Sequence, residues 1–94
     1  MKVIWSADAT NDVLQIREYI GHDNLSAAKL VAVTIIHGTE KLLEVFPLSG
    51  RVGRLTGTHE LIVPKLPYVV VYQVSKESIN ILRVYHTSRL WSEM

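Results

Sequence analysis

The side chains best suited to chemistry lie near the C-terminal end of this chain. Arg83, His86 and Arg89 follow one another at spacings of three residues. A histidine with a pKa of about 6.5 can accept or donate a proton, and an arginine can hold a phosphate through two hydrogen bonds. These three residues are therefore candidate catalytic groups for phosphodiester cleavage. The structural alternative is that His86 ends an edge strand and hydrogen-bonds the C-terminal tail.

Arg83 also needs a partner for its charge. It is expected to share a strand face with apolar and aromatic neighbours, because side chains two residues apart lie on the same face. A charge among such neighbours requires an anion. The anion could be internal, from Glu60 or the C-terminal carboxylate. It could also be external, a phosphate or an acidic residue of another protein.

A second group of residues could bind a macromolecule without catalysing a reaction. Arg51 and Arg54 fall in a glycine-bearing stretch, residues 48–57, which we expect to be an exposed loop. Solvated arginines can make positioning contacts there, although an ordinary loop charge is the alternative. The complete set of candidate residues for binding a target or partner is Arg51, Arg54, His59, Glu60, Lys65, Arg83, His86, Arg89 and Trp91.

No metal site or cofactor is predicted. The chain has four histidines and no cysteine, and no two histidines have the HxH or HxxxH spacing of a zinc site. No apolar run approaches the roughly 18–20 residues of a membrane-spanning helix, and the N-terminus lacks the apolar core of a signal peptide. We therefore expect a cytoplasmic protein with no membrane partner.

Length and charge describe the scaffold that must hold these candidates. Ninety-four residues allow one small domain, expected to span residues 1–94. The net charge of +1 is unevenly divided. Residues 1–45 carry four basic and six acidic side chains, whereas residues 46–94 carry six basic and three acidic ones. A basic half suggests an anionic partner, and the alternative is a chance distribution of charges.

Hydrophobic periodicity predicts a helical hairpin in the first half of the chain. A short strand over residues 2–5 should be followed by a helix that begins at Ser6 as N-cap and ends near Ile20, with Gly21 as the stop. A second helix, capped by Asp23 or Asn24, should run to about Val45. Pro47 forbids its continuation.

The second half predicts a sheet. Stretches rich in β-branched residues cover 58–63, 68–74 and 78–86, and their short connections imply antiparallel neighbours. The segment 68–74 is apolar on both faces, as expected at the centre of a sheet. The predicted fold is therefore α+β in the order β-α-α-β-β-β, with the hairpin packed on one face of a mainly antiparallel sheet.

Several short motifs occur in a characteristic order through nearly the whole chain. They are Ile4-Trp5-Ser6, Tyr19-Ile20, Phe46-Pro47, Gly50-Arg51, Gly53-Arg54, Gly57-Thr58-His59-Glu60-Leu61, Pro67-Tyr68-Val69-Val70-Val71-Tyr72 and Ile81-Leu82-Arg83-Val84. In this order and spacing they resemble the RelE/ParE superfamily, the toxins of bacterial type II toxin-antitoxin modules. The resemblance implies the same fold, neutralisation by a cognate antitoxin, and contact with operator DNA only through that antitoxin.

The resemblance leaves the target open. RelE-like members cleave messenger RNA in the ribosomal A site, whereas ParE-like members poison DNA gyrase. Ribonuclease members commonly place an arginine on the middle strand directly after an aromatic residue, and here Val69 follows Tyr68. This departure favours a non-enzymatic gyrase inhibitor. The alternatives are a ribosome-dependent endonuclease that uses Arg83, His86 and Arg89, and a non-toxic module that only binds its partner.

Overall fold

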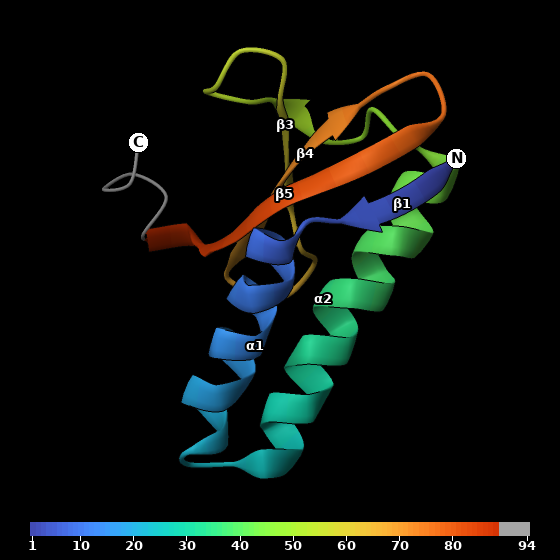
Figure 1. Cartoon of the computed structure of the whole chain (residues 1–94). Coiled ribbons are helices and arrows are strands. Elements are labelled where there is room, and N and C mark those ends of the chain that lie inside the picture. The colour runs from blue at the N-terminus through green and yellow to red at the C-terminus, as the bar shows by residue number, and fades with distance from the viewer. Residues whose placement is uncertain (89–94) are drawn as a thin grey trace.

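The computed structural model describes residues 1–88 and has a five-stranded sheet with two helices against one face (Figure 1). The predicted α+β order is confirmed, with one extra short strand. The elements are β1 (Lys2–Trp5), α1 (Ala7–Gly21), α2 (Leu25–Val45), β2 (Arg51–Val52), β3 (His59–Ile62), β4 (Tyr68–Val74) and β5 (Ser78–His86). Neither helix is long and apolar enough to cross a lipid bilayer, within the residues described.

Side-chain caps define where the two helices begin. Ser6 Oγ accepts a hydrogen bond from the Ala9 N–H at 3.0 Å, and Asn24 Oδ1 accepts one from the Ala27 N–H at 3.0 Å. Each cap satisfies a backbone donor that has no partner inside its helix. The prediction that Gly21 lies just past the end of the first helix and stops it is wrong. Gly21 is the last residue of α1, and the chain leaves it through His22 in a right-handed conformation that needs no glycine.

The core lies between the helices and one sheet face. Small side chains of α1, such as Ala9 and Val13, and larger ones of α2, such as Ile35 and Leu43, are buried against the sheet. Tyr72 from β4 is fully buried at the centre of this layer. Burial of each Val, Leu or Ile side chain contributes on the order of 1.5–3 kcal/mol, which fixes the helical hairpin on the sheet.

The strand order is β1-β5-β4-β3-β2, so the prediction that residues 68–74 form the centre of the sheet is confirmed. β4 is antiparallel to both of its neighbours, and its residues Val69, Val70 and Val71 are buried. β1 is parallel to β5 and covers only Ser78–Ile81 of that nine-residue strand. The remainder of β5 lies beside the start of α1.

The stretch 48–57 is not entirely loop, contrary to the prediction. Arg51 and Val52 form β2 and pair with β3, with Arg51 opposite Glu60. Glycines allow this tight return. The Gly53 N–H donates to the Thr58 carbonyl at 2.8 Å, and a Cβ on Gly53 would collide with Thr58 Oγ1. Gly57 has φ = +81°, a backbone conformation that favours glycine.

Candidate functional site

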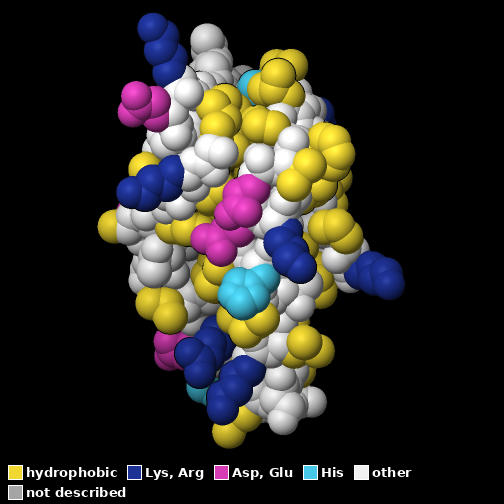
Figure 2. Space-filling model, turned by 90° about the vertical axis from the view of Figure 1, so that its right-hand side faces the viewer, with side chains coloured by type: hydrophobic (Ala, Val, Ile, Leu, Met, Phe, Trp, Pro, Cys, Tyr) yellow, Lys and Arg dark blue, Asp and Glu magenta, His cyan; other side chains and the backbone are white. Residues whose placement is uncertain are grey.

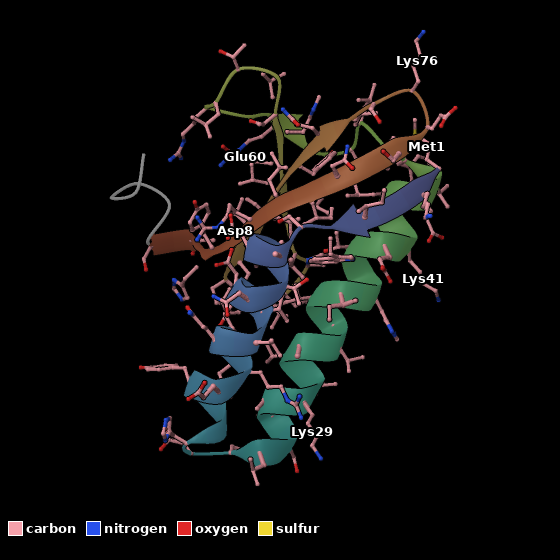
Figure 3. All side chains as sticks on the ribbon, in the orientation of Figure 1. Met1, Asp8, Lys29, Lys41, Glu60 and Lys76 are labelled. Carbon is pink, nitrogen blue, oxygen red and sulfur yellow. The ribbon has the colours of Figure 1, made fainter. Side chains whose placement is uncertain are left out.

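The stretch 50–58, which we call the arginine loop, is organised by one buried carboxylate. Glu60 is only 2% exposed and accepts hydrogen bonds from Arg51 Nε at 3.2 Å, Arg51 Nη2 at 3.0 Å and the Arg54 N–H at 3.1 Å. A buried charge needs such partners. The sequence suggested that Glu60 belongs to an exposed basic surface. In the structure Glu60 is instead buried beneath the arginine loop and holds that loop through its hydrogen bonds. Figure 3 shows Glu60 at the sheet, far from the tip of the helical hairpin.

The start of the arginine loop is tied to the core through Tyr72. The Gly50 N–H donates to Tyr72 Oη at 2.9 Å, and a Cβ at Gly50 would lie only 2.7 Å from that oxygen. Burial raises the pKa of Tyr72, although the bond from Gly50 opposes the shift. His59 stacks on the Tyr72 ring with centroids 5.5 Å apart. His59 is therefore a partly buried contact of the core rather than an open surface group.

Arg83 is bound to an acidic residue that the sequence analysis did not choose. Its Nε lies 2.8 Å from Asp12 Oδ2 and its Nη2 lies 3.0 Å from Asp12 Oδ1. This hydrogen-bonded pair raises the pKa of Arg83 above its usual value, despite burial. The guanidinium also lies 4.8 Å from the centre of the Tyr85 ring. Of the alternatives considered for this anion, Glu60 is therefore not the partner, and the C-terminal carboxylate lies outside the described residues.

The local topology explains why Asp12 is the partner. β1 ends at Trp5, so among residues 1–88 β5 has no strand neighbour beyond Ile81 on that side. The start of α1 takes over, because Ser6 Oγ donates to the Leu82 carbonyl at 2.9 Å and Asp12 Oδ2 accepts from the Val84 N–H at 2.9 Å. Asp12 thus accepts hydrogen bonds both from the Val84 N–H at the edge of β5 and from the Arg83 guanidinium. Its sequence signal was an acidic side chain beside the apolar stripe of the first helix, without an indication of which strand would meet it.

His86 lies at the end of β5 in a different environment. It packs edge-to-face on Tyr68 with ring centroids 5.5 Å apart, and its Nδ1 lies 2.8 Å from Ser88 Oγ. A cavity of about 490 Å³ beside it is lined by Asp12, Gln15, Ile16, Tyr19, Tyr68, Val84, His86 and Ser88. Arg83 is not among the lining residues. At His86, β5 has β4 as its strand neighbour on one side and, within residues 1–88, no strand on the other side, which agrees with the structural alternative that His86 ends an edge strand.

The candidates therefore divide into two groups rather than one site. His59 is opposite Tyr72 whereas His86 is opposite Tyr68, a separation of four residues or about 13 Å along β4. Lys65 lies in the connection between β3 and β4 with φ = 65°. Arg89 and Trp91 lie outside the described residues. Within residues 1–88, no three His, Asp or Glu side chains are grouped so that they could hold a metal ion.

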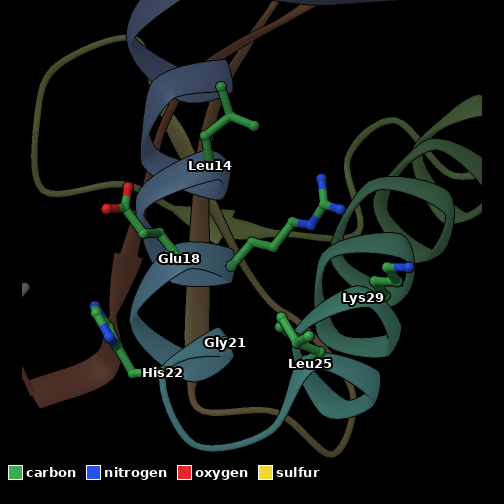
Figure 4. Close-up of a pocket in the computed structure, with 8 residues that line it drawn as sticks. Leu14, Glu18, Gly21, His22, Leu25 and Lys29 are labelled. Atoms are coloured by element: carbon green, nitrogen blue, oxygen red, sulfur yellow. The ribbon is translucent and has the colours of Figure 1, made fainter.

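A further hollow lies between the two helices near the tip of the hairpin (Figure 4). We call it the hairpin groove; it has a volume of about 560 Å³ and is lined by Leu14, Arg17, Glu18, Gly21, His22, Leu25, Ala28 and Lys29. This groove was not predicted from the sequence. The available signal was a pair of leucines on helix positions away from the predicted apolar stripes.

Comparison with known proteins identifies the family of the chain. Residues 3–91 match the model of the ParE toxin of the type II toxin-antitoxin system parDE. The chain belongs to this family. Putative toxin Y4kP of Sinorhizobium fredii is 32% identical over 93 residues, which cover 99% of this chain and 95% of that protein. Toxin RelE2 of Caulobacter vibrioides is 34% identical over 89 residues, covering 95% and 98%.

Solved structures support the fold of this ParE-family toxin. The chromosomal ParDE system of P. aeruginosa contains a chain that superposes with a TM-score of 0.83 at 22% identity, over 92% of this chain and 95% of that one. YafQ of E. coli strain BL21(DE3) superposes with a TM-score of 0.52 at 16% identity, over 96% and 97%. The chain is thus a toxin of the RelE/ParE superfamily in a type II system, which implies a cognate antitoxin.

Proposed function

We propose that this toxin arrests growth by poisoning DNA gyrase as a protein inhibitor, without catalysing a reaction, and that its antitoxin neutralises it. The observation that carries the proposal is the position of Arg83, which does not line the cavity beside His86. Its guanidinium instead donates hydrogen bonds through Nε and Nη2 to the two oxygens of the Asp12 carboxylate.

RNA cleavage would need more than His86 in that cavity. A base must activate the 2′-hydroxyl, a cation must stabilise the phosphorane charge, and an acid must protonate the leaving oxygen. The described lining of the cavity contains one histidine, two tyrosines and one acidic residue, but no lysine or arginine. The described groups therefore favour binding over cleavage.

The arginine loop is the proposed contact with gyrase. Glu60 and the glycines fix its backbone, and the Arg51 side chain remains 54% exposed while it is tied to Glu60. A rigid basic segment loses little conformational entropy when it meets an acidic protein surface or DNA phosphates. Arg51 and Arg54 would supply these contacts in the gyrase complex.

A supercoiling assay with purified gyrase tests the proposal. The toxin should inhibit supercoiling and accumulate cleaved DNA, and Arg51→Ala with Arg54→Ala should weaken inhibition by about tenfold or more, since each lost ionic contact costs on the order of 1 kcal/mol. Lys76→Ala, which removes a cation from the β4–β5 turn, is the matched control and should inhibit normally. Unchanged supercoiling at high toxin excess would refute gyrase as the target.

One observation favours a second candidate, ribosome-dependent cleavage of messenger RNA. His86, Tyr68 and Ser88 surround a cavity in which an acid-base group could act. Primer extension on a translated message after toxin induction would reveal A-site cleavage that His86→Ala abolishes. Intact message during growth arrest would eliminate it. Harmless induction without the antitoxin would instead favour a module that only binds its partner.

A further inference from the structure

The segment that joins α2 to β2 and continues into the arginine loop exposes many large apolar side chains. Phe46 is 61% exposed, Leu48 is 67% exposed and Val52 is 82% exposed. Val45 and Leu55 are also more than half exposed. Exposed apolar residues that are scattered singly need no explanation, but a group of them within residues 45–55 is typical of a surface that a partner covers.

Part of this segment borders a hollow of about 600 Å³, which we call the apolar hollow. Its lining includes Val45, Phe46 and Leu48 from the segment and Met1 and Val74 from elsewhere in the chain. On the face drawn in Figure 2, hydrophobic side chains gather toward the upper right, at the end of the molecule where α2 finishes in Figure 1. No described residue of the lining has a charged side chain, so the hollow suits an apolar side chain and gives a phosphate no side chain to pair with.

The backbone of the segment is already held in place in the toxin alone. The Phe46 N–H donates to the Leu42 carbonyl at 2.8 Å, and the Ser49 N–H donates to the Phe46 carbonyl at 3.1 Å. One residue later, the hydrogen bond from Gly50 to Tyr72 begins the arginine loop. The apolar hollow and the arginine loop therefore form one continuous and ordered surface, which loses little conformational entropy on binding.

The edge of the sheet at β2 is open. β2 is the last strand in the order β1-β5-β4-β3-β2, so within residues 1–88 no strand lies beyond it. The Gly53 N–H donates to the Thr58 carbonyl across this pair of strands, and the alternation of an antiparallel ladder then directs the N–H and C=O of Val52 away from β3. An extended segment of another protein can form hydrogen bonds with these two groups.

The two residues of β2 differ in chemistry on the two faces of the sheet. Val52 is opposite His59, which is opposite Tyr72, so the Val52 side chain lies on the face that carries the helices. Arg51 lies on the other face, opposite Glu60. Its bonds to Glu60 use Nε and Nη2, and its side chain remains 54% exposed. A strand beside β2 would therefore meet an apolar surface on one face and a guanidinium on the other.

We propose that the open edge of β2 binds an extended segment of the gyrase protein in which apolar and acidic side chains alternate. The apolar side chains would cover Val52 and the apolar hollow, and the acidic ones would pair with Arg51, because successive side chains of a strand point to opposite faces. This inference rests on gyrase as the target, and it assigns the contact to the polypeptide of gyrase and not to its DNA. Interfaces with DNA are polar and strongly basic, whereas an apolar centre with a polar rim is typical of protein interfaces.

Surface plasmon resonance of the toxin on purified gyrase, without DNA, tests the inference. Leu48→Glu with Val52→Glu should weaken binding by about tenfold or more, because the new carboxylates enter an apolar contact and repel the acidic segment. Leu30→Glu is the matched control, since Leu30 on α2 is 67% exposed, as Leu48 is. This control should bind gyrase within about twofold of the unchanged toxin. Phe46→Ala, which removes an exposed ring without adding charge, should weaken binding in the same direction as the double variant.

The outcomes separate this inference from the proposed function. Circular dichroism first establishes which variants are folded, and Phe46→Ala decides the question if the double variant is not. Undiminished gyrase affinity of the folded variants would overturn the assignment, and so would binding that occurs only after DNA is added. The antitoxin should bind these variants as tightly as the unchanged toxin, and a loss of antitoxin affinity with normal gyrase binding would assign the surface to the antitoxin instead. Normal supercoiling with excess unchanged toxin would refute gyrase as the target, and this occupant of the β2 edge with it.

Discussion

At the scale of single residues, Asp12 has the most consequential contacts of any charged side chain in α1. It satisfies Arg83 and the Val84 N–H together while its side chain is only 11% exposed. The contact between α1 and β5 cannot be predicted from the sequence, because Asp12 and Arg83 are 71 residues apart. The need of Arg83 for an anion could be predicted, but the identity of that anion could not.

Replacement of Asp12 by alanine should therefore destabilise the fold. We expect a loss of about 2 kcal/mol in the free energy of unfolding, since a strand-edge donor and a partly buried guanidinium lose their acceptor. Urea denaturation followed by tryptophan fluorescence measures the change. Asn11→Ala on the exposed side of α1 should alter the free energy by less than about 0.5 kcal/mol. Equal stabilities of the two variants would contradict the role of Asp12.

Tyr68 makes the stability of the toxin depend on alkaline pH. Burial, and then the nearby Tyr19, raise the pKa of Tyr68 above its ordinary value. The folded state therefore holds the proton that the unfolded chain loses first. The stabilisation is fully present below the ordinary tyrosine pKa and is lost as pH rises through the higher pKa of the folded protein.

Tyrosinate absorbance during an alkaline titration measures this effect. A late phase should appear in the folded toxin, should shrink in Tyr68→Phe, and should be missing from the chain unfolded in denaturant, where every tyrosine titrates alike. If Tyr68→Phe left the late phase unchanged, the assignment to Tyr68 would be wrong. Tyr72, whose pKa burial also raises, should account for what remains after Tyr68 is replaced.

At the scale of elements, the two helices could be predicted from their periodicity and their caps, and the four strands β1, β3, β4 and β5 could be predicted from their β-rich sequences. β2 could not, since a two-residue strand has no periodicity. β2 forms because Arg51 hydrogen-bonds Glu60 on β3 and because the glycines allow the tight turn between the two strands. The exposed hairpin groove was missed for a similar reason. It depends on how two helices meet, and neither helix alone specifies the hollow.

The arginine loop gives a prediction at this scale. Gly53→Ala should cost about 2 kcal/mol, because its Cβ would meet both the side chain and the backbone of Thr58. Gly38→Ala in the middle of α2 is the matched control. No atom lies within 4 Å of its new Cβ, so it should stabilise the toxin by up to about 1 kcal/mol. Thermal unfolding measures both, and destabilisation by Gly38→Ala exceeding that by Gly53→Ala would contradict the packing argument.

At the scale of the whole molecule, the toxin is a small domain with exposed leucine side chains, which a bound partner would cover. Binding to the folded state alone adds about 2.7 kcal/mol at an antitoxin concentration one hundred times Kd. For a chain of 94 residues this corresponds to a rise in Tm of roughly 10–20 °C. Calorimetry of the toxin with and without antitoxin measures the shift.

The sheet order also governs when this toxin can become active during its synthesis. β1 is made before the other strands of the sheet, yet its strand partner within residues 1–88 is β5, and the nearby bond between Ser6 and Leu82 joins residues 76 positions apart. The first strand must therefore wait until the last one has left the ribosome, and contacts so distant in sequence form slowly. During that interval the helical hairpin, whose contacts are local, can already form. An antitoxin that recognises the hairpin could thus bind the toxin before its sheet closes.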